Sequence, residues 1–352
     1  MSDSGVIDWG LAARAGARLA PSGPKMTEYT AEQAMRELAD ASVRAEGPVR
    51  EVTGLADGLP VPAARVLDRP EWIAAASESM RHLVTVTQGG DDEPADAGGS
   101  FLGGKPGGVQ AGAMLAFLST AILGQYDPFT GPDGTLLLVA PNIVSVERSL
   151  RLQPSDFRLW VCLHEVTHRV QFSSSPWLAG YMKDTVGVLQ DGADEPVSDV
   201  VGRLVEAIRS RGGSSDGKSS SDGGIVGLLR ATQAPPQQEA LDRLLVLGTL
   251  LEGHADHVMD AVGPAVVPSV TSIRQAFDSR RTRKQNPVQR IVRALLGMDA
   301  KMAQYVRGKA FVDAVVEQVG MERFNTVWTS PETLPLMSEI DAPQQWTARV
   351  LG

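Results

Sequence analysis

The segment that most constrains the fold of this 352-residue chain is His164-Glu165-Val166-Thr167-His168. Side chains four positions apart on a helix lie one above the other on the same face, so the two imidazoles can reach one metal ion. Leu163 and Val170 supply apolar contacts on such a helix. The spacing therefore predicts a helix over this segment with one face directed at a metal site.

Glu165 lies beside the two histidines, displaced around the helix. In sites of this type the histidines supply neutral nitrogen ligands, and the glutamate takes a proton from water instead of binding the metal. The segment therefore predicts Zn²⁺ as the cofactor, with Glu165 as the catalytic general base.

The third ligand is expected from a carboxylate on a second helix, which would complete a His-His-Glu set. Glu195 and Glu252 each begin an E-x-x-x-D sequence. Glu195 stands among acidic residues where a helix begins, which favours exposure. Glu252 follows a long apolar helical run, where a carboxylate needs a metal or a partner to offset desolvation. Glu252 is therefore the preferred ligand.

Gly253, directly after this glutamate, supports the same choice. A glycine in the middle of a helix costs roughly 1 kcal/mol relative to alanine. Its presence predicts close approach of another backbone, such as the helix that carries His164.

Several further residues are candidates for supporting roles. Asp256, one turn after Glu252, could accept the distal N–H of a ligand histidine and fix its orientation. Tyr305 could donate to the oxyanion of a tetrahedral intermediate, although packing is the simpler role. His254 or His257 could serve the same role or, like Asp256, support the metal ligands. Cys162 is expected to be a small buried apolar residue that points away from the metal.

The remaining sequence predicts a mostly α fold with a small β-sheet. A helical layer is expected over residues 1–130, with two helices separated near Pro21 to Pro24, and a catalytic region over 131–352. Leu136 to Ala140 predicts a strand near the cleft, to which an extended substrate could add. Ser155 is the expected cap of the histidine helix. Residues 211–224, rich in serine and glycine, predict a flexible insertion.

Composition narrows the class of protein. A net charge of -9 argues against nucleic acid as the main partner. No apolar stretch reaches the roughly 18 residues of a membrane-spanning helix. The single cysteine excludes an internal disulfide, and the N-terminus lacks a signal core, so a cytoplasmic location is expected.

Six segments resemble a known family, and the match extends over nearly the whole chain. They are VLDRPEWI, LGQYDPF, LLLVAPNI, DFRLWVCLHEVTHRVQF, LLEGHADHVMDAVGP and LPLMSEIDAPQQWTARV. They resemble an actinobacterial family of zincin-like proteins, labelled zinc-dependent metalloproteases or hydrolases and in some cases associated with deazaflavin coenzyme biosynthesis. HEVTH with a downstream E-x-x-x-D helix is also similar to the gluzincin arrangement of thermolysin-like metallopeptidases. The resemblance implies a zincin-like core in which His164, His168 and Glu252 bind zinc and Glu165 is the base.

The expected activity is therefore hydrolysis of an amide bond in a peptide or protein substrate. Two alternatives use the same residues. One is a zincin-fold binding or scaffold protein with a structural metal, and the other is a hydrolase of non-peptide amides. The presence of Glu165 favours catalysis, because a structural site needs ligands but no base.

Overall fold

The computed structural model describes residues 7–85, 104–191, 234–282 and 298–352. The chain divides into two compact units, Met1–Ala179 with Val258–Ser279, and Gly180–His257 with Arg280–Gly352. This grouping does not test the expected boundary at residue 130, which stays a prediction. The expected insertion at 211–224 and Glu195 lie outside the described residues. Within those residues, no helix combines the length and apolarity that crossing a membrane requires.

The sheet of the first unit has three short strands. They are β1 (Arg65–Leu67), β2 (Gly124–Asp127) and β3 (Thr135–Val139), in the order β1-β3-β2. β1 is parallel to β3 and β2 is antiparallel to it. The predicted strand at Leu136 is confirmed, but its expected role in pairing with a substrate is wrong, because β3 is paired on both sides. β2 is paired only with β3 among the described strands.

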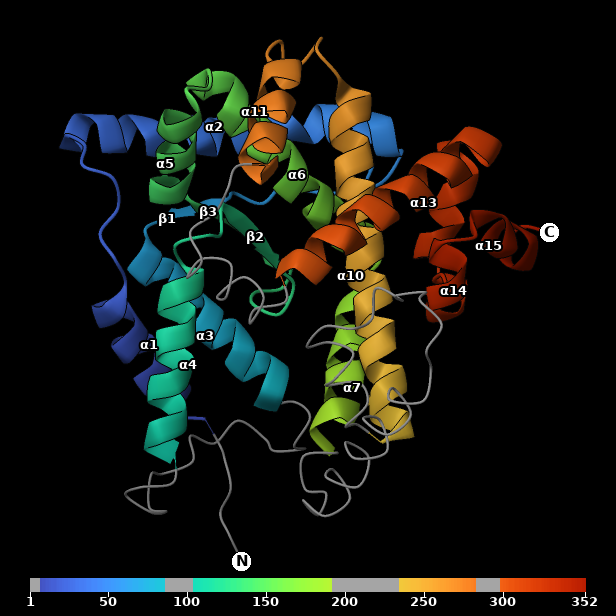
Figure 1. Ribbon diagram of the computed structural model, residues 1–352, viewed down its shortest axis with the longest axis horizontal. Helices are drawn as coiled ribbons and strands as arrows, with labels where there is room; N and C mark the ends of the chain where they lie inside the picture. The colour runs from blue at the N-terminus through green and yellow to red at the C-terminus, as the bar shows by residue number, and fades with distance from the viewer. Residues whose placement is uncertain (1–6, 86–103, 192–233, 283–297) are drawn as a thin grey trace, which may run out of the picture. The chain divides into compact units, whose positions relative to one another are not determined.

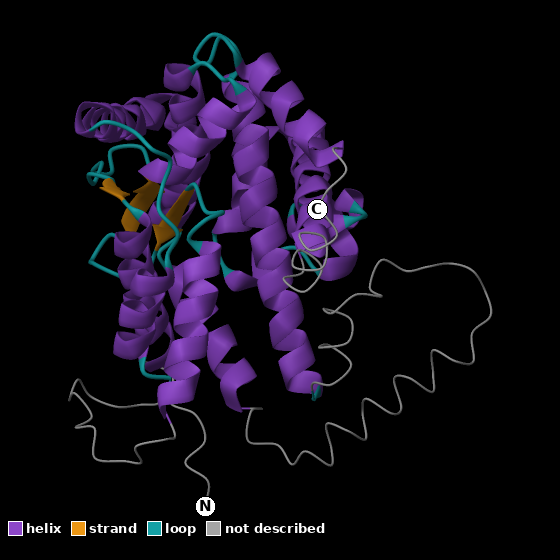
Figure 2. Cartoon of the chain, turned by 60° about the vertical axis from the view of Figure 1, so that its left-hand side comes forward, coloured by secondary structure: helices purple, strands orange, loops and turns teal. Residues whose placement is uncertain are grey.

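Helices cover both faces of this sheet (Figures 1 and 2). Leu136 and Leu138 of β3 enter the core that contains α2 (Glu28–Thr53) and α6 (Pro154–Ser174). Leu137 and Val139 enter a second core with α3 (Arg69–Thr85) and α4 (Gly104–Leu118). The alternation follows from the two-residue period of a strand. A mostly helical fold with a small buried sheet, as expected from the sequence, is confirmed.

Four more helices begin in or belong to the first unit. They are α1 (Trp9–Leu19), α5 (Ala140–Leu150), α7 (Trp177–Asp191) and α11 (Val270–Thr282). The predicted break near Pro21 to Pro24 separates α1 from α2. The predicted cap of α6 is wrong. Pro154 occupies the first turn, so Gln153 is the capping position and Ser155 lies inside the helix.

α10 (Pro235–Val262) is one continuous helix whose last residues enter the core of the first unit. In the second unit it crosses α13 (Met298–Phe324) at two glycines. A Cβ added to Gly253 would lie 2.2 Å from the carbonyl carbon of Gly308. The close approach predicted from Gly253 is therefore present. Its partner is α13, however, and not the helix that carries His164.

The C-terminal part of the second unit is packed around aromatic rings. α14 (Met337–Ile340) and α15 (Pro343–Val350) follow two short 3₁₀ turns at Asn325–Trp328 and Pro331–Thr333. Trp346 of α15 is fully buried, and its ring centroid lies 5.9 Å from that of Phe311 on α13. Its indole N–H donates to the Thr333 carbonyl at 2.8 Å.

Candidate metal centre

α6 brings the two predicted histidine ligands together. The Nε2 atoms of His164 and His168 lie 3.2 Å apart, and their rings are almost perpendicular. Two nitrogens bound to one tetrahedral zinc at about 2.0–2.1 Å would be roughly 3.3 Å apart. The observed separation fits this requirement. Both side chains are partly buried, as a site accessible to substrate requires.

Gln171 fixes the outer nitrogen of one histidine. Its Oε1 lies 2.9 Å from Nδ1 of His168, and the glutamine side chain is completely buried. With the proton on Nδ1, the ring donates to Gln171 and directs the Nε2 lone pair towards His164. Sequence reasoning assigned an orienting role to Asp256 and missed Gln171. The available signal was its position, three residues after His168 on the same helix face.

Glu165 lies against the edge strand of the sheet. It is 7% exposed. A Cβ added to Gly124 of β2 would be 2.6 Å from the Glu165 Cγ and 2.9 Å from its Oε1. Only glycine therefore leaves room at this strand position for the carboxylate. The geometry puts the predicted base beside the backbone of β2, which is one of the two edge strands of this sheet among the described strands.

Two arginines anchor α6 to its neighbours. Arg158 forms a two-pronged ion pair with Glu147 of α5, at 2.8 and 3.0 Å, and also pairs with Glu37. Arg169 pairs with Glu46 of α2 and donates to the Pro62 carbonyl at 2.6 Å. Buried pairs of this type hold side chains in one geometry. They fix the rotation of α6 about its axis, and so the direction in which the histidines point.

Cys162 lies on the side of α6 that faces α2. Its side chain is fully buried, with Sγ 3.8 Å from the Leu38 carbonyl oxygen. Burial raises the pKa of the thiol far above its ordinary value. The expectation of a buried apolar residue is confirmed.

One group of three potential ligand side chains occurs among the described residues. It consists of His164, His168 and Glu252, whose ligand atoms all lie within 4.8 Å of one another. Glu252 stands on α10, less than two turns before Val258, a residue of the first unit's core. Two imidazole nitrogens and one carboxylate oxygen form a donor set that catalytic zinc sites use. The residues present therefore fit a zinc ion.

The two histidines of α10 have different surroundings. His254 is completely buried, with its ring centroid 5.3 Å from that of Trp328. Nδ1 of His257 lies 2.7 Å from Oδ1 of Asp313, and Oδ2 of the same carboxylate accepts from Lys309 at 2.5 Å. Burial alone would raise the pKa of Asp313, but these hydrogen bonds outweigh it and lower the pKa. His257 thus has a carboxylate partner on α13.

The structure gives less information about two other predicted residues. Asp256 is half-buried one turn after Glu252, as expected on a continuous helix. Tyr305 belongs to α13, but its side chain lies outside the described residues. The supporting roles of both stay predictions.

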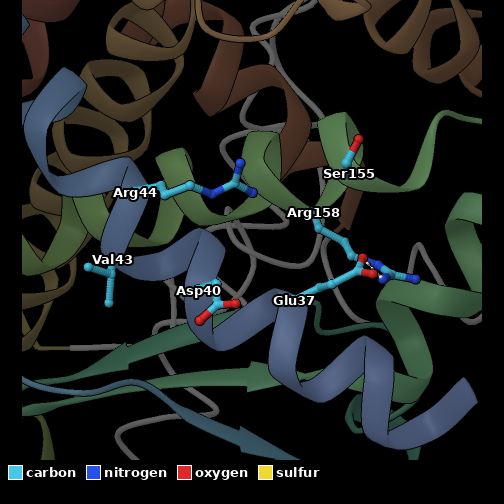
Figure 3. Close-up of a pocket in the computed structure, with 6 residues that line it drawn as sticks. All are labelled: Glu37, Asp40, Val43, Arg44, Ser155 and Arg158. Atoms are coloured by element: carbon cyan, nitrogen blue, oxygen red, sulfur yellow. Dashed lines mark hydrogen bonds and ion pairs between the residues drawn. The ribbon is translucent and has the colours of Figure 1, made fainter. Parts of the chain in front are cut away.

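The wide pocket between α2 and α6 is a separate feature (Figure 3). It measures about 620 Å³ and is lined by Glu37, Asp40, Val43, Arg44, Ser155 and Arg158. Arg158 is committed to its two glutamate partners. The lining carries two acids and two bases but no histidine, so it lacks the chemistry of the candidate site.

A family model described as zincin-like metallopeptidase matches residues 7–347. The chain belongs to this family. A crystal structure of a "putative hydrolase with a novel fold" from Chloroflexus aurantiacus is similar to this zincin-like chain, with 30% identity and a TM-score of 0.63 over 98% of both chains. No curated protein shows significant similarity. The zincin-like part of the resemblance is confirmed, whereas the actinobacterial origin and the deazaflavin association stay predictions.

Proposed function

We propose that the chain is a zinc-dependent peptidase in which His164, His168 and Glu252 hold the metal and Glu165 is the general base. The observation that supports this most directly is the grouping of the three potential ligands within 4.8 Å. The position of Glu165 supports the proposed base. Its carboxylate lies against Gly124 of an edge strand, and a peptide can pair with the backbone of such a strand.

The chemistry that zinc supplies when bound is polarisation of the scissile carbonyl and a lower pKa for water. Glu165 accepts a proton from the attacking water on its carboxylate, and the oxygen of that water bonds to the carbonyl carbon. The carbon–nitrogen bond then breaks as the protonated Glu165 returns the proton to the leaving nitrogen.

An extended substrate is proposed to pair with the free edge of β2. Its backbone would then run past Gly124, beside the Glu165 carboxylate. Hydrogen bonds between strands supply affinity that does not depend on side chains, and pockets on alternate residues supply specificity. This arrangement replaces the expected pairing at β3.

The first experiment measures bound zinc and hydrolysis of an unbiased peptide library. His164→Ala and His168→Ala are each expected to lose the roughly one zinc per chain, because two ligands do not retain it. Glu165→Gln is expected to keep the zinc and the fold and to lose hydrolysis. Unchanged zinc in either histidine variant would refute the metal site. Hydrolysis at the parental rate in Glu165→Gln would refute the base.

Gly124→Ala tests the placement of the base without altering any ionisable group. The added methyl would occupy the space of the Glu165 side chain, which is flexible enough to move aside. A displacement of about 1 Å at a catalytic group costs on the order of 100-fold in rate. We therefore expect kcat to fall by about 100-fold, while the zinc content and the Tm stay at the parental values. Full activity in this variant would show that the Glu165 position next to β2 is not used.

The same measurements separate the alternatives. A scaffold protein with a structural metal would bind zinc and lose it in the histidine variants, yet cleave no library member. A hydrolase of non-peptide amides would leave peptides intact and cleave small acylated amines in a Glu165-dependent way.

A further inference from the structure

The exposed face of α4 in the first unit is apolar. Its members lie within an arc of about 140° around the helix, and they are Val109, Gln110, Ala113, Met114 and Phe117. The three large apolar side chains among them are 42% to 48% exposed. No residue of α4 after Lys105 is charged. We call this surface, formed by the exposed side chains of residues 109–117, the outer face of α4.

The large apolar side chains of the outer face are not the ones that hold α4 in place. The helix packs on α1 and α3 through its other side, which carries Gly108, Gly112, Leu115 and Ala116. A Cβ added to Gly112 would lie only 2.6 Å from the Ala12 carbonyl oxygen of α1. Small residues thus face the protein and large apolar residues face outwards. This is the reverse of the usual pattern of a helix on a protein surface.

α2 of the same unit shows the usual pattern. Glu32, Arg36, Asp40 and Arg44 follow one another at four-residue intervals on its exposed face. Charged side chains on the outer face are typical of a helix that is stable in water, whereas a helix that is apolar on all sides is normally buried. Methionine and phenylalanine in place of charged residues are typical of the centre of a protein interface. The outer face of α4 therefore has the composition of a covered surface.

The charge of the chain indicates a second copy as the partner. A two-fold interface sets each surface patch against the same patch of the other subunit. Because the net charge of the chain is -9, pairing most of its surface with itself would oppose like charges. The uncharged outer face of α4 avoids this repulsion. A membrane surface fits less well, because helices that lie on lipid are rich in lysine and arginine, and α4 has Lys105 alone.

We propose that the outer face of α4 is the interface through which two copies of this chain form a homodimer. This inference is independent of the proposed peptidase function. Residues 109–117 span about 12 Å along the helix, which is short for an interface that buries roughly 800 Å² on each partner. The dimer is therefore reversible, with a dissociation constant of about 1–100 μM.

The test is sedimentation velocity of the full-length protein from about 1 to about 300 μM, which brackets the expected dissociation constant. The mass is expected to rise from that of one chain to that of two. Met114→Glu should weaken this association by about 30-fold or more, because it removes an apolar contact and sets a charge against its own copy. The matched control is Met35→Glu on α2, where the wild-type side chain is 42% exposed. It should leave the association unchanged.

Chemical cross-linking places the interface independently of Met114→Glu. The single cysteine of the chain, Cys162, is fully buried, so Ala113→Cys adds the one exposed thiol. A short bismaleimide is expected to join two Ala113→Cys chains into a covalent dimer. Met35→Cys, which puts the thiol on α2, should stay monomeric under the same conditions.

Each remaining outcome contradicts the homodimer. A wild-type protein that stays monomeric over the whole concentration range overturns it, as does association that Met114→Glu leaves unchanged. If Met114→Glu does not fold, cross-linking decides, and equal yields from Ala113→Cys and Met35→Cys overturn the proposal. A monomeric protein that binds phosphatidylcholine vesicles, and loses that binding in Met114→Glu, overturns it as well and assigns the outer face of α4 to lipid.

Discussion

Replacement of Gln171 by leucine should weaken zinc binding although Gln171 is not a ligand. The wild-type side chain is fully buried, and its Oε1 lies 2.9 Å from Nδ1 of His168. Leucine has nearly the same size but no acceptor, so the imidazole N–H would lose its partner. Such a loss costs about 1–3 kcal/mol when the group is buried. Outer partners of metal-bound histidines are worth about 10- to 100-fold in metal affinity, which is the same range.

The assay is zinc affinity by competition with a chromophoric chelator, with the fold monitored by circular dichroism. Gln171→Glu retains an acceptor for His168 and should bind zinc at least as tightly as the parent. Thr167→Val is a matched control on α6, because the Thr167 hydroxyl is buried and donates to the Leu163 carbonyl, not to a histidine. It should reduce stability without a selective effect on zinc.

The reasoning is refuted if Gln171→Leu binds zinc within twofold of the parent. It is also refuted if Gln171→Glu loses as much affinity as Gln171→Leu, since that would assign the effect to packing and not to the acceptor.

Two further predictions concern stability. Gly253→Ala should lower the free energy of unfolding by about 1–3 kcal/mol in denaturant titrations, because its methyl would meet the backbone of Gly308 at 2.2 Å. Gly248 is the control on the same helix, since nothing lies within 4 Å of a Cβ added there. Gly248→Ala should be neutral or stabilising by up to about 1 kcal/mol. Burial raises the pKa of Glu339, but hydrogen bonds from Arg349 and a backbone N–H outweigh it and lower the pKa below 4.5. Because the folded-state pKa is depressed, this stabilisation is present above pH 4.5 and is lost as pH falls further. Glu339→Gln should therefore destabilise the protein at pH 7, and the difference from the parent should shrink below pH 4.5; a gap that stays constant with pH would contradict the assignment.

The histidine helix could be predicted because it depends on local information. The choice of Glu252 over Glu195 also depends on local sequence, and it stays a prediction. The spacing of His164 and His168 needs only one helix, and the argument for Glu252 needs only the apolar run before it. Glu252 then appears in the group of potential ligands, whereas Glu195 lies outside the described residues.

Features that depend on contacts between distant segments of the chain could not be predicted from the sequence. Gly253 signalled close backbone contact, but nothing local to it named α13 as the partner. The apolar run at β3 predicted a buried strand and could not reveal that two neighbours would occupy both its edges. Nothing local to Gly124 indicated that its strand would lie against Glu165.

The register of β2 on β3 decides which residue meets Glu165. Gly124 pairs with Leu138, whose side chain belongs to the core shared with α6, while Leu137 belongs to the core on the other face. A slip of one residue would reverse the facing of β2 and bring Gln125 towards Glu165. The carboxylate would then meet a long polar side chain instead of a bare backbone. The packing of two apolar cores thereby determines which part of the β2 backbone lies beside Glu165.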